Sequence, residues 1–305
     1  APNLLDITVD GRQIKAVAQV SKQGFVYVFD RVTGEPVWPI EERAVATDTD
    51  LVGEVMSSTQ PFPTRPAPFE YQGTSIEDLA DFTPEIRQMA IEAVEGYRLG
   101  PLFTPQMRGG TIMRPAVGGG ANWSGAAVDP ETGILYVPSA NVHSVIQLTE
   151  PEPHEASTLR YIRRSVSGGP VMPRGLPLWK PPYTRMTAID MNTGEHAWMT
   201  PTGHGDRIRN HPMLRDLDLP PVGGDAGRSG PLLTKTLLIH AVTTGGTGNG
   251  PRLVAYDKAT GAVLASLDLP AGALGAPMTY MLDGRQHIAL TVGGQVPGLV
   301  VYRLP

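Results

Sequence analysis

The pattern Asp-x-x-Thr-Gly occurs four times in this chain of 305 residues, and it constrains the fold more than any other feature. Each copy follows a short apolar run rich in β-favouring residues and precedes a second such run. An Asp side chain accepts backbone N–H groups two or three residues further on, and glycine supplies the positive φ that closes a tight turn. Each copy therefore predicts two antiparallel strands joined by a turn. The copies are Asp30–Gly34, Asp129–Gly133, Asp190–Gly194 and Asp257–Gly261.

Two of the copies end in a tryptophan at the same offset, Trp38 and Trp198. Internal repeats of small antiparallel sheets are typical of a β-propeller, so we predict an all-β fold in one domain over residues 1–305. We expect each interval between copies to hold one blade, which gives about four blades and a terminal strand pair. Hairpins are predicted at Asp10-Gly11 near the start and at Asp283-Gly284 near the end.

The β pattern stops over residues 39–110, which we interpret as an inserted segment. Its first half is rich in proline, and its second half is typical of a helix that begins after Thr83, with Pro84 at the first helical position. Apolar residues recur from Ile86 to Tyr97 at helical spacing. We expect this face to pack on the propeller, with the insertion over or beside one end of the channel, because long insertions in compact domains are usually functional.

Composition excludes several classes of function. The net charge of -5 argues against nucleic acid as a partner, because binding to phosphates needs clustered Lys and Arg. The chain has no cysteine, which excludes disulfides and thiolate metal sites. No apolar stretch approaches the roughly 20 residues of a membrane helix. The chain begins at Ala1 rather than Met, so we expect that it has been processed, trimmed or cut from something longer.

Lys22 is the first candidate site residue, because it precedes Gly24 at the start of a predicted strand. From there its side chain can project into one end of a channel, where an ammonium group would stabilise negative charge on a carbonyl oxygen. The alternative is a surface lysine at a strand edge, and lysine is rarely buried.

Asn122 and Trp123 are the second candidate, within the segment GGGANWSG at residues 118–125. The glycines allow close approach of the backbone to a ligand, Asn offers a donor and an acceptor, and Trp offers a flat apolar face. The alternative is a blade connection whose Trp packs in the core. A phosphate-binding loop would precede a helix, whereas a strand follows here, which excludes a nucleotide site.

The seven histidines suggest no metal site of their own. None forms the His-x-x-x-His pair of a helical zinc site, and His204 and His211, which share a loop with Asp206 and Asp216, are the residues nearest to a ligand set. Loop histidines are more often solvated or satisfied by neighbours, so we expect no metal ligands here.

Residues 22–39 and 118–139 resemble the quinoprotein dehydrogenases that use pyrroloquinoline quinone (PQQ), above all the membrane-bound glucose dehydrogenase type and its polyol and quinate relatives. The resemblance extends over essentially the whole chain and includes GLPLWKPPY at 175–183 and APMTYMLDGRQHIAL at 276–290. It implies an eight-bladed propeller with PQQ on its axis beside a calcium ion. It also implies oxidation of a sugar, polyol or alcohol hydroxyl by hydride transfer to the quinone, with an aspartate as base, in the periplasm.

By this resemblance Lys22 matches the cationic residue at the quinone oxygen, which gives it a catalytic and a cofactor-binding role. Asn122 and Trp123 match the segment that approaches the carboxylate side of the cofactor. The family's aspartate base and calcium ligands lie in a half that would precede Ala1, so the chain resembles the C-terminal half, with no metal ligands of its own. Exposed blade faces would then associate with a second polypeptide or a second copy that completes the ring.

Two other hypotheses remain open from the sequence. One is a non-catalytic propeller scaffold that binds peptides or partner proteins, like the quinoprotein-like propellers of outer-membrane assembly. Such a scaffold needs neither Lys22 nor the 39–110 segment, and both features favour the enzyme. The other is a self-contained four-bladed propeller, which would be a compact monomer in solution.

Overall fold

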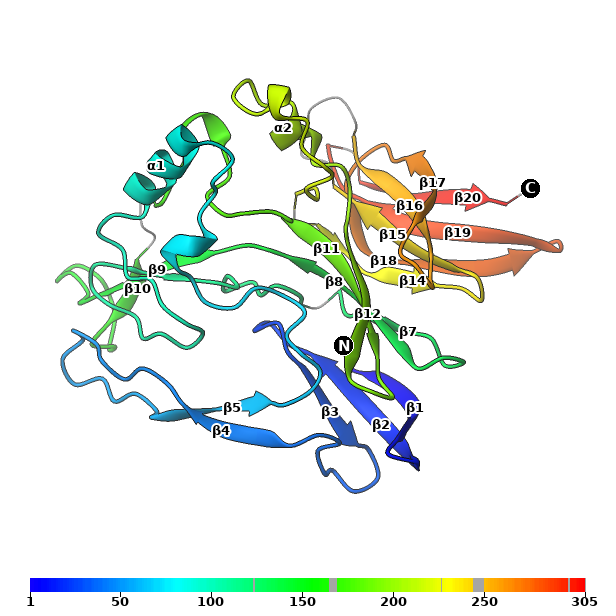
Figure 1. Ribbon diagram of the computed structural model, residues 1–305, viewed down its shortest axis with the longest axis horizontal. Coiled ribbons are helices and arrows are strands. Elements are labelled where there is room, and N and C mark those ends of the chain that lie inside the picture. Colours follow the sequence, from blue (N-terminus) through cyan, green and yellow to red (C-terminus); the bar gives the residue numbers. More distant parts are fainter. Residues whose placement is uncertain (123, 165–168, 226, 244–249, 296, 305) are drawn as a thin grey trace.

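The computed structural model describes residues 1–122, 124–164, 169–225, 227–243, 250–295 and 297–304. These residues form mainly antiparallel strands, with two short α-helices. Four of the sheets stand in a row in chain order, from the N-terminal sheet at the bottom of Figure 1 to the C-terminal sheet at its right. This arrangement confirms the predicted all-β class and a partial propeller.

The first sheet holds the predicted N-terminal hairpin. Its strands are β1 (Asn3–Val9), β2 (Arg12–Val20) and β3 (Val26–Asp30), in the order β1-β2-β3. Asp10 and Gly11 join β1 to β2 with φ of 49° and 77°. Positive φ at both central residues is the signature of the tight hairpin turn that an Asp-Gly pair favours.

The second sheet contains two of the repeated turns, which corrects the expectation that each interval between copies holds one blade. It comprises β7 (Ala127–Val128), β8 (Ile134–Ala140), β11 (Thr184–Asp190) and β12 (Glu195–Pro201), in the order β12-β11-β8-β7. The Asp129 turn joins β7 to β8, and the Asp190 turn joins β11 to β12. The Asp-x-x-Thr-Gly pattern indicates a turn between two antiparallel strands. A four-stranded blade contains more than one such turn, so the pattern does not count blades.

The last two sheets complete the row. The third is β14 (Pro231–Leu233), β15 (Leu237–Val242), β16 (Arg252–Asp257) and β17 (Val263–Asp268), in that order. The fourth is β13 (Arg228–Ser229), β18 (Ala273–Leu282), β19 (Arg285–Val292) and β20 (Gly298–Arg303). Asp283 and Gly284 turn β18 into β19 with φ of 50° and 72°, which confirms the predicted final hairpin.

All four repeated turns have the predicted geometry. In each, the Asp Oδ1 accepts the backbone N–H two residues on, at 2.8 Å in the Asp30 and Asp190 turns, 2.9 Å in the Asp257 turn and 3.1 Å in the Asp129 turn. The closing glycine has a positive φ and donates its N–H back to the carbonyl oxygen of the Asp. The side chain and the glycine thus fix the turn together.

The two repeat tryptophans connect neighbouring sheets. A Cβ atom at Gly194 would lie 3.3 Å from the Trp38 ring, and one at Gly261 would lie 2.7 Å from the Trp198 ring. Each tryptophan therefore packs on the turn glycine of the following sheet. Lys258, in the fourth turn, adds a charged link, because its Nζ donates to Asp129 Oδ2 at 2.7 Å.

The core lies between the sheets. Strand β8 contributes to two interfaces, since Leu135 and Val137 pack toward the first sheet and Tyr136 packs toward the third. In the same way β15 contributes Leu238 to the cluster shared with the second sheet and Ile239 to the cluster shared with the fourth. Both faces of these strands are buried, as expected of strands inside a stack of sheets.

Residues 39–110 contain more regular structure than the sequence pattern indicates. Strands β4 (Ile40–Ala44) and β5 (Thr59–Pro63) form a hairpin that the pattern did not predict. Helix α1 (Pro84–Ala93) is confirmed, and Thr83 Oγ1 accepts the N–H of Ile86 at 3.2 Å. The remaining elements are β6 (Thr111–Met113), β9 (Ser144–Thr149), β10 (Ile162–Arg164) and α2 (Asp206–Arg209).

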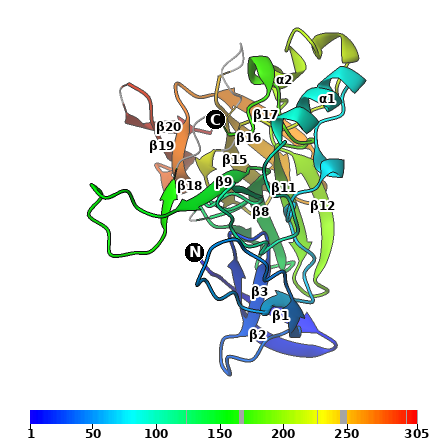
Figure 2. The ribbon, with the colours of Figure 1, turned by 90° about the vertical axis from the view of Figure 1, so that its left-hand side faces the viewer.

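The buried face of α1 packs on other connections rather than on the row of four sheets. Ile86, Ala90 and Val94 share a core cluster with Leu176 and Trp179 and with residues of the 208–222 loop. The long connections therefore build a second core, at the upper left of Figure 1. Figure 2 shows that the connection between β9 and β10 projects away from the body.

Candidate functional site

The glycine segment Gly118–Gly120 runs against Lys22. Gly120 donates its N–H to the Lys22 carbonyl oxygen at 3.0 Å. Gly119 has a φ of 85°, and a Cβ atom there would lie 2.7 Å from Lys22 Cα. Since a side chain at this position would clash with backbone, the segment needs glycine to lie this close to the first sheet.

Lys22 and Asn122, two of the three candidate residues from the sequence, donate to neighbouring backbone carbonyl oxygens where this segment begins. Lys22 Nζ donates to the Val117 carbonyl oxygen at 3.2 Å, and Asn122 Nδ2 donates to the Gly118 carbonyl oxygen at 2.8 Å. Lys22 is exposed, and within the described part of the chain its Nζ forms no ion pair. Trp123, the third candidate, lies outside the described residues.

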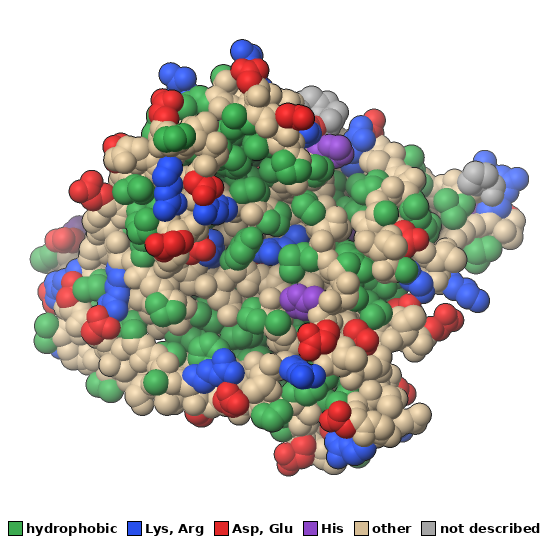
Figure 3. Space-filling view, viewed as in Figure 1, with side chains coloured by type: hydrophobic (Ala, Val, Ile, Leu, Met, Phe, Trp, Pro, Cys, Tyr) green, Lys and Arg blue, Asp and Glu red, His purple; other side chains and the backbone are tan. Residues whose placement is uncertain are grey.

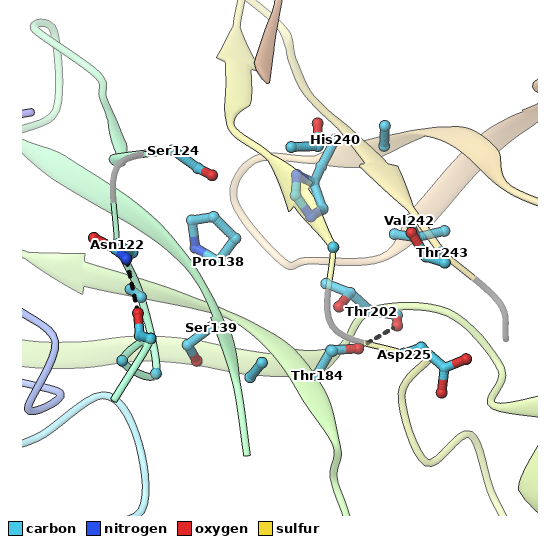
Figure 4. Close-up of a pocket in the computed structure, with 18 of the residues that line it drawn as sticks. Asn122, Ser124, Pro138, Ser139, Thr184, Thr202, Asp225, His240, Val242 and Thr243 are labelled. Carbon is cyan, nitrogen blue, oxygen red and sulfur yellow. Dashed lines mark hydrogen bonds between the residues drawn. The ribbon is translucent and has the colours of Figure 1, made fainter. Parts of the chain in front are cut away.

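The two candidates line different cavities. Asn122 lines the larger, of about 630 Å³, whereas Lys22 and Val117 line another, of about 420 Å³. The larger cavity lies between the second and third sheets (Figure 4), and polar side chains from β8, β11 and β15 and from the connections that follow β12 and β15 face it. Those side chains are Ser139, Thr184, Thr202, Asp225, His240 and Thr243.

His240 is the titratable residue that the sequence did not single out. It lies in β15 on the wall of the larger cavity and is 7% exposed. Burial lowers the pKa of His240 to about 4, although its hydrogen bond to the Gly230 backbone opposes that shift. The ring is therefore neutral at pH 7. Among the described residues, neither its Nδ1 nor the nearby Ser139 Oγ has a hydrogen-bond partner.

A buried ion pair packs against the glycine segment. Arg185, in β11, pairs with the carboxylate of Glu70, and their side chains are 6% and 0% exposed. A Cβ atom at Gly120 would lie 2.7 Å from Glu70 Cγ, so the acidic side chain fills the space under the segment. Sequence reasoning missed this pair, because nothing in the local pattern connects residue 70 to a strand 115 positions later.

A second buried arginine lies beside this pair. Arg114 donates from Nε to the Gly73 carbonyl oxygen at 2.8 Å and pairs with Asp78 at 3.0 Å. It stacks on the Trp179 ring, whose Nε1 donates to His143 Nδ1 at 2.8 Å. Burial, followed by the positive charge of Arg114, lowers the pKa of His143 to about 4.

The described residues hold neither a metal-binding cluster nor a membrane-spanning helix. In the residues with described positions, no group of three or more His, Asp and Glu side chains comes together as a metal site. None of the helices there has the length and apolar character to cross a bilayer. Basic and acidic side chains are interspersed over the face shown in Figure 3.

Comparison with known proteins decides the family. The family model described as "Glucose/ethanol/alcohol dehydrogenase, beta-propeller domain" (PQQ) matches residues 1–288. The chain belongs to this family. The family assignment agrees with the resemblance seen in the glycine segment and the repeated turns.

Individual relatives give the same result. The chain is 28% identical to a quinate/shikimate dehydrogenase (quinone) of Acinetobacter baylyi, over 96% of this chain and 38% of the relative. It is 27% identical to the glycerol dehydrogenase large subunit of Gluconobacter thailandicus, over 97% of this chain and 44% of the relative. The chain thus spans about two fifths of the length of these relatives.

A solved structure with the same fold is the quinohemoprotein alcohol dehydrogenase of Comamonas testosteroni. It aligns over 99% of this chain and 37% of its own chain, with a TM-score of 0.55 and 21% identity. At this identity the likeness shows the fold alone.

PQQ, which the family implies, is a flat tricarboxylate quinone, and two residues that could contact it line separate cavities, Asn122 the larger and Lys22 the smaller. Lys22 supplies a cation, Asn122 supplies an amide, and the glycine segment between them leaves the backbone open to close approach. The unpaired Ser139 Oγ, in the wall of the larger cavity, is a further hydrogen-bonding group near Asn122.

Proposed function

We propose that this chain is the C-terminal portion of a PQQ-dependent oxidoreductase that oxidises a hydroxyl group of a sugar, polyol or alcohol. The observation that carries the proposal is the convergence of Lys22 and Asn122 on the glycine segment, in a chain of the quinoprotein family. When bound, the quinone would supply the two-electron oxidant that accepts the hydride. We further propose a periplasmic location, by analogy with the family.

The proposed role of Lys22 is electrostatic. Its ammonium group, placed beside a quinone oxygen, would stabilise the negative charge that grows on this oxygen during reduction. Its hydrogen bond to Val117 holds the side chain along the glycine segment, and the absence of an ion pair in the described residues leaves the charge available. Lys22 is therefore proposed as both a catalytic and a cofactor-binding residue.

Asn122 and Trp123 would position the cofactor. The Asn122 amide is oriented by its bond to Gly118 and can offer its oxygen or its second N–H to a polar group of the ligand. Trp123 would add a flat apolar surface. We propose that the catalytic aspartate and the Ca²⁺ ligands lie outside these 305 residues.

The test uses the native polypeptide that contains this chain, loaded with PQQ and Ca²⁺. Dye reduction is measured with glucose, glycerol, quinate and ethanol. We expect activity with at least one hydroxyl substrate, and a fall in kcat for Lys22→Ala of about 10-fold to 100-fold, because a charged hydrogen bond is worth about 1.5–3 kcal/mol. Lys15→Ala, at an exposed lysine of β2, is the control and should leave kcat unchanged. Equal activity of the two variants would contradict the role of Lys22.

Exposed apolar side chains support a partner that completes the ring. Large apolar residues of the last two sheets are solvent-exposed, among them Leu299 at 66% and Met281 at 64%. Contiguous exposed apolar surface marks an interaction site. We propose that a second polypeptide segment or a second copy of the chain covers this face. Light scattering tests the idea, and a stable monomer of 32.6 kDa would oppose it.

The same apolar face is the one observation that favours a non-catalytic scaffold for peptide or protein partners. The two functions separate in a binding experiment. A scaffold would retain its partners after Lys22→Ala and Asn122→Ala and would show no affinity for PQQ, whereas the enzyme would bind PQQ and lose affinity in both variants.

A further inference from the structure

A smaller cavity, of about 280 Å³, adjoins the larger cavity described above, and we refer to it as the side cavity. Val142 and Asp225 line both cavities, and Figure 4 shows Asp225 at the edge of the larger one. Three connections build the side cavity: the one after β8, the one before β11 and the one that contains α2. Its volume is just below the range of about 300–1,000 Å³ for a complete small-molecule site. It therefore suits one end of a ligand whose remainder lies in the larger cavity.

An ion pair with accessible side chains forms part of the wall. Arg207 Nη2 donates to Asp225 Oδ1 at 3.3 Å, and Arg207 Nη1 donates to the Gly175 carbonyl oxygen at 3.0 Å. Both side chains of the pair are 40% exposed, so a molecule in the cavity can contact them. Because the two charges compensate each other, the pair presents hydrogen-bond donors and an acceptor side by side rather than a net charge.

His143 adds a donor of fixed orientation. Its Nδ1 accepts the Nε1–H of Trp179 at 2.8 Å, and the ring is neutral at pH 7 because the pKa of His143 is lowered to about 4. A neutral imidazole carries one proton, which is then on Nε2. Within the described part of the chain this Nε2–H has no hydrogen-bond partner, and it is not among the unpaired polar atoms that are closed off from solvent. It is therefore available to a molecule in the side cavity.

A hydroxyl group is the chemical group that suits this wall. It donates to a carboxylate and accepts from a guanidinium or an imidazole N–H, so it can use both members of the ion pair and His143. Pro177 and Tyr183 provide apolar surface for the C–H groups between hydroxyls. A molecule with hydroxyls on adjacent carbons can bond to several of these groups at once. A simple alcohol has no second hydroxyl to place there.

We propose that the side cavity binds the hydroxyl-rich end of the substrate, so that the chain favours a polyol or a sugar over a simple alcohol. Asp225 accepts hydrogen bonds from this end of the substrate, and Arg207 and His143 donate to it. The inference rests on the proposed function, because the hydroxyl to be oxidised would lie in the larger cavity. The three residues determine specificity and take no part in hydride transfer.

The experiment compares erythritol with 1-butanol, which has the same number of carbon atoms but a single hydroxyl. Binding to the native polypeptide that contains this chain is measured by saturation-transfer NMR, with PQQ and Ca²⁺ under reducing conditions, in which the quinone cannot take up hydride. We expect erythritol to bind about 10-fold more tightly than 1-butanol, in line with one net hydrogen bond to a charged group. Asp225→Ala and Arg207→Ala should each reduce this preference by about 5-fold or more.

The matched controls are Asp216→Ala and Arg215→Ala. These residues form an exposed ion pair at 3.9 Å that does not line the side cavity, so both variants should keep the preference for erythritol. Dye reduction gives a second readout under oxidising conditions. The ratio of kcat/KM for erythritol to that for 1-butanol should fall by a similar factor in Asp225→Ala, mainly through KM.

Equal affinities of the wild type for erythritol and 1-butanol would overturn the inference. A preference for erythritol that is unchanged in both Asp225→Ala and Arg207→Ala would overturn it as well. Erythritol binding that depends on Asp225, without oxidation of either alcohol, would support the side cavity as a polyol site and contradict the proposed dehydrogenase function.

Discussion

The Glu70 carboxylate and the Arg185 guanidinium form an ion pair that joins the 39–110 segment to β11 almost entirely out of contact with solvent. Arg185 also stacks on the Tyr71 ring, with its Cζ 4.1 Å from the ring centroid. The Glu70 side chain packs directly against Gly120. The ion pair therefore fixes the position of the glycine segment that precedes Asn122. A connection that is remote in sequence thereby shapes the candidate site.

Glu70→Gln should lower the free energy of unfolding by about 3–5 kcal/mol, because it leaves the Arg185 charge buried without a counter-charge. Denaturant unfolding measures the loss. The matched control is Glu41→Gln, which breaks the exposed pair with Arg43 and should cost less than about 1 kcal/mol. Equal costs would show that the buried pair has no special role. The double variant Glu70→Gln, Arg185→Met should recover part of the loss.

Gly261→Ala should destabilise the protein more than Gly34→Ala. Both glycines close a repeated turn with positive φ, so each alanine incurs a backbone cost of about 1–2 kcal/mol. An alanine Cβ at Gly261 would also lie 2.7 Å from the Trp198 ring, whereas nothing lies within 4 Å at Gly34. Thermal unfolding of the two variants gives the excess cost of disturbing the contact between sheets. A larger loss for Gly34→Ala would contradict the proposed packing role of Trp198.

Stability should fall as the pH decreases from about 6.5 to 4. The pKa values of His143 and His240 are lowered to about 4 in the folded protein, whereas an unfolded histidine titrates near 6.5. Over this window the unfolded state binds more protons, so stability rises with pH, is complete above about 6.5 and is lost toward pH 4. Urea unfolding at several pH values measures the slope. His240→Leu should make it shallower, and an unchanged slope would show that His240 does not contribute.

The sequence indicated the fold well wherever the information was local. The Asp-x-x-Thr-Gly turns, both Asp-Gly hairpins and the capped helix after Thr83 depend on residues within a few positions of one another, and all of them are present. Which turns belong to the same blade was not local information. Asp129 and Asp190 share one sheet because β8 pairs with β11 across a long connection, and no turn motif reports that pairing.

The candidate site was predictable only where its residues stand in a local sequence pattern. A glycine cluster before a strand singled out Asn122, and the approach to the first repeat singled out Lys22. Their convergence, and the contributions of Glu70, Arg185 and His240, depend on contacts between distant segments. A single charged residue in a β-rich sequence does not indicate which distant residue it pairs with. The β4–β5 hairpin was missed because its strands contain two prolines and three charged residues, which are unusual in strands.

The most direct test is equilibrium binding of PQQ to the native polypeptide that contains this chain, measured by quenching of protein fluorescence. We predict saturable binding to the wild type, an increase in Kd of about 10-fold or more for Lys22→Ala and for Asn122→Ala, and no change for Lys15→Ala. Wild-type affinity in both site variants, or no binding of PQQ by the wild type, would contradict this prediction.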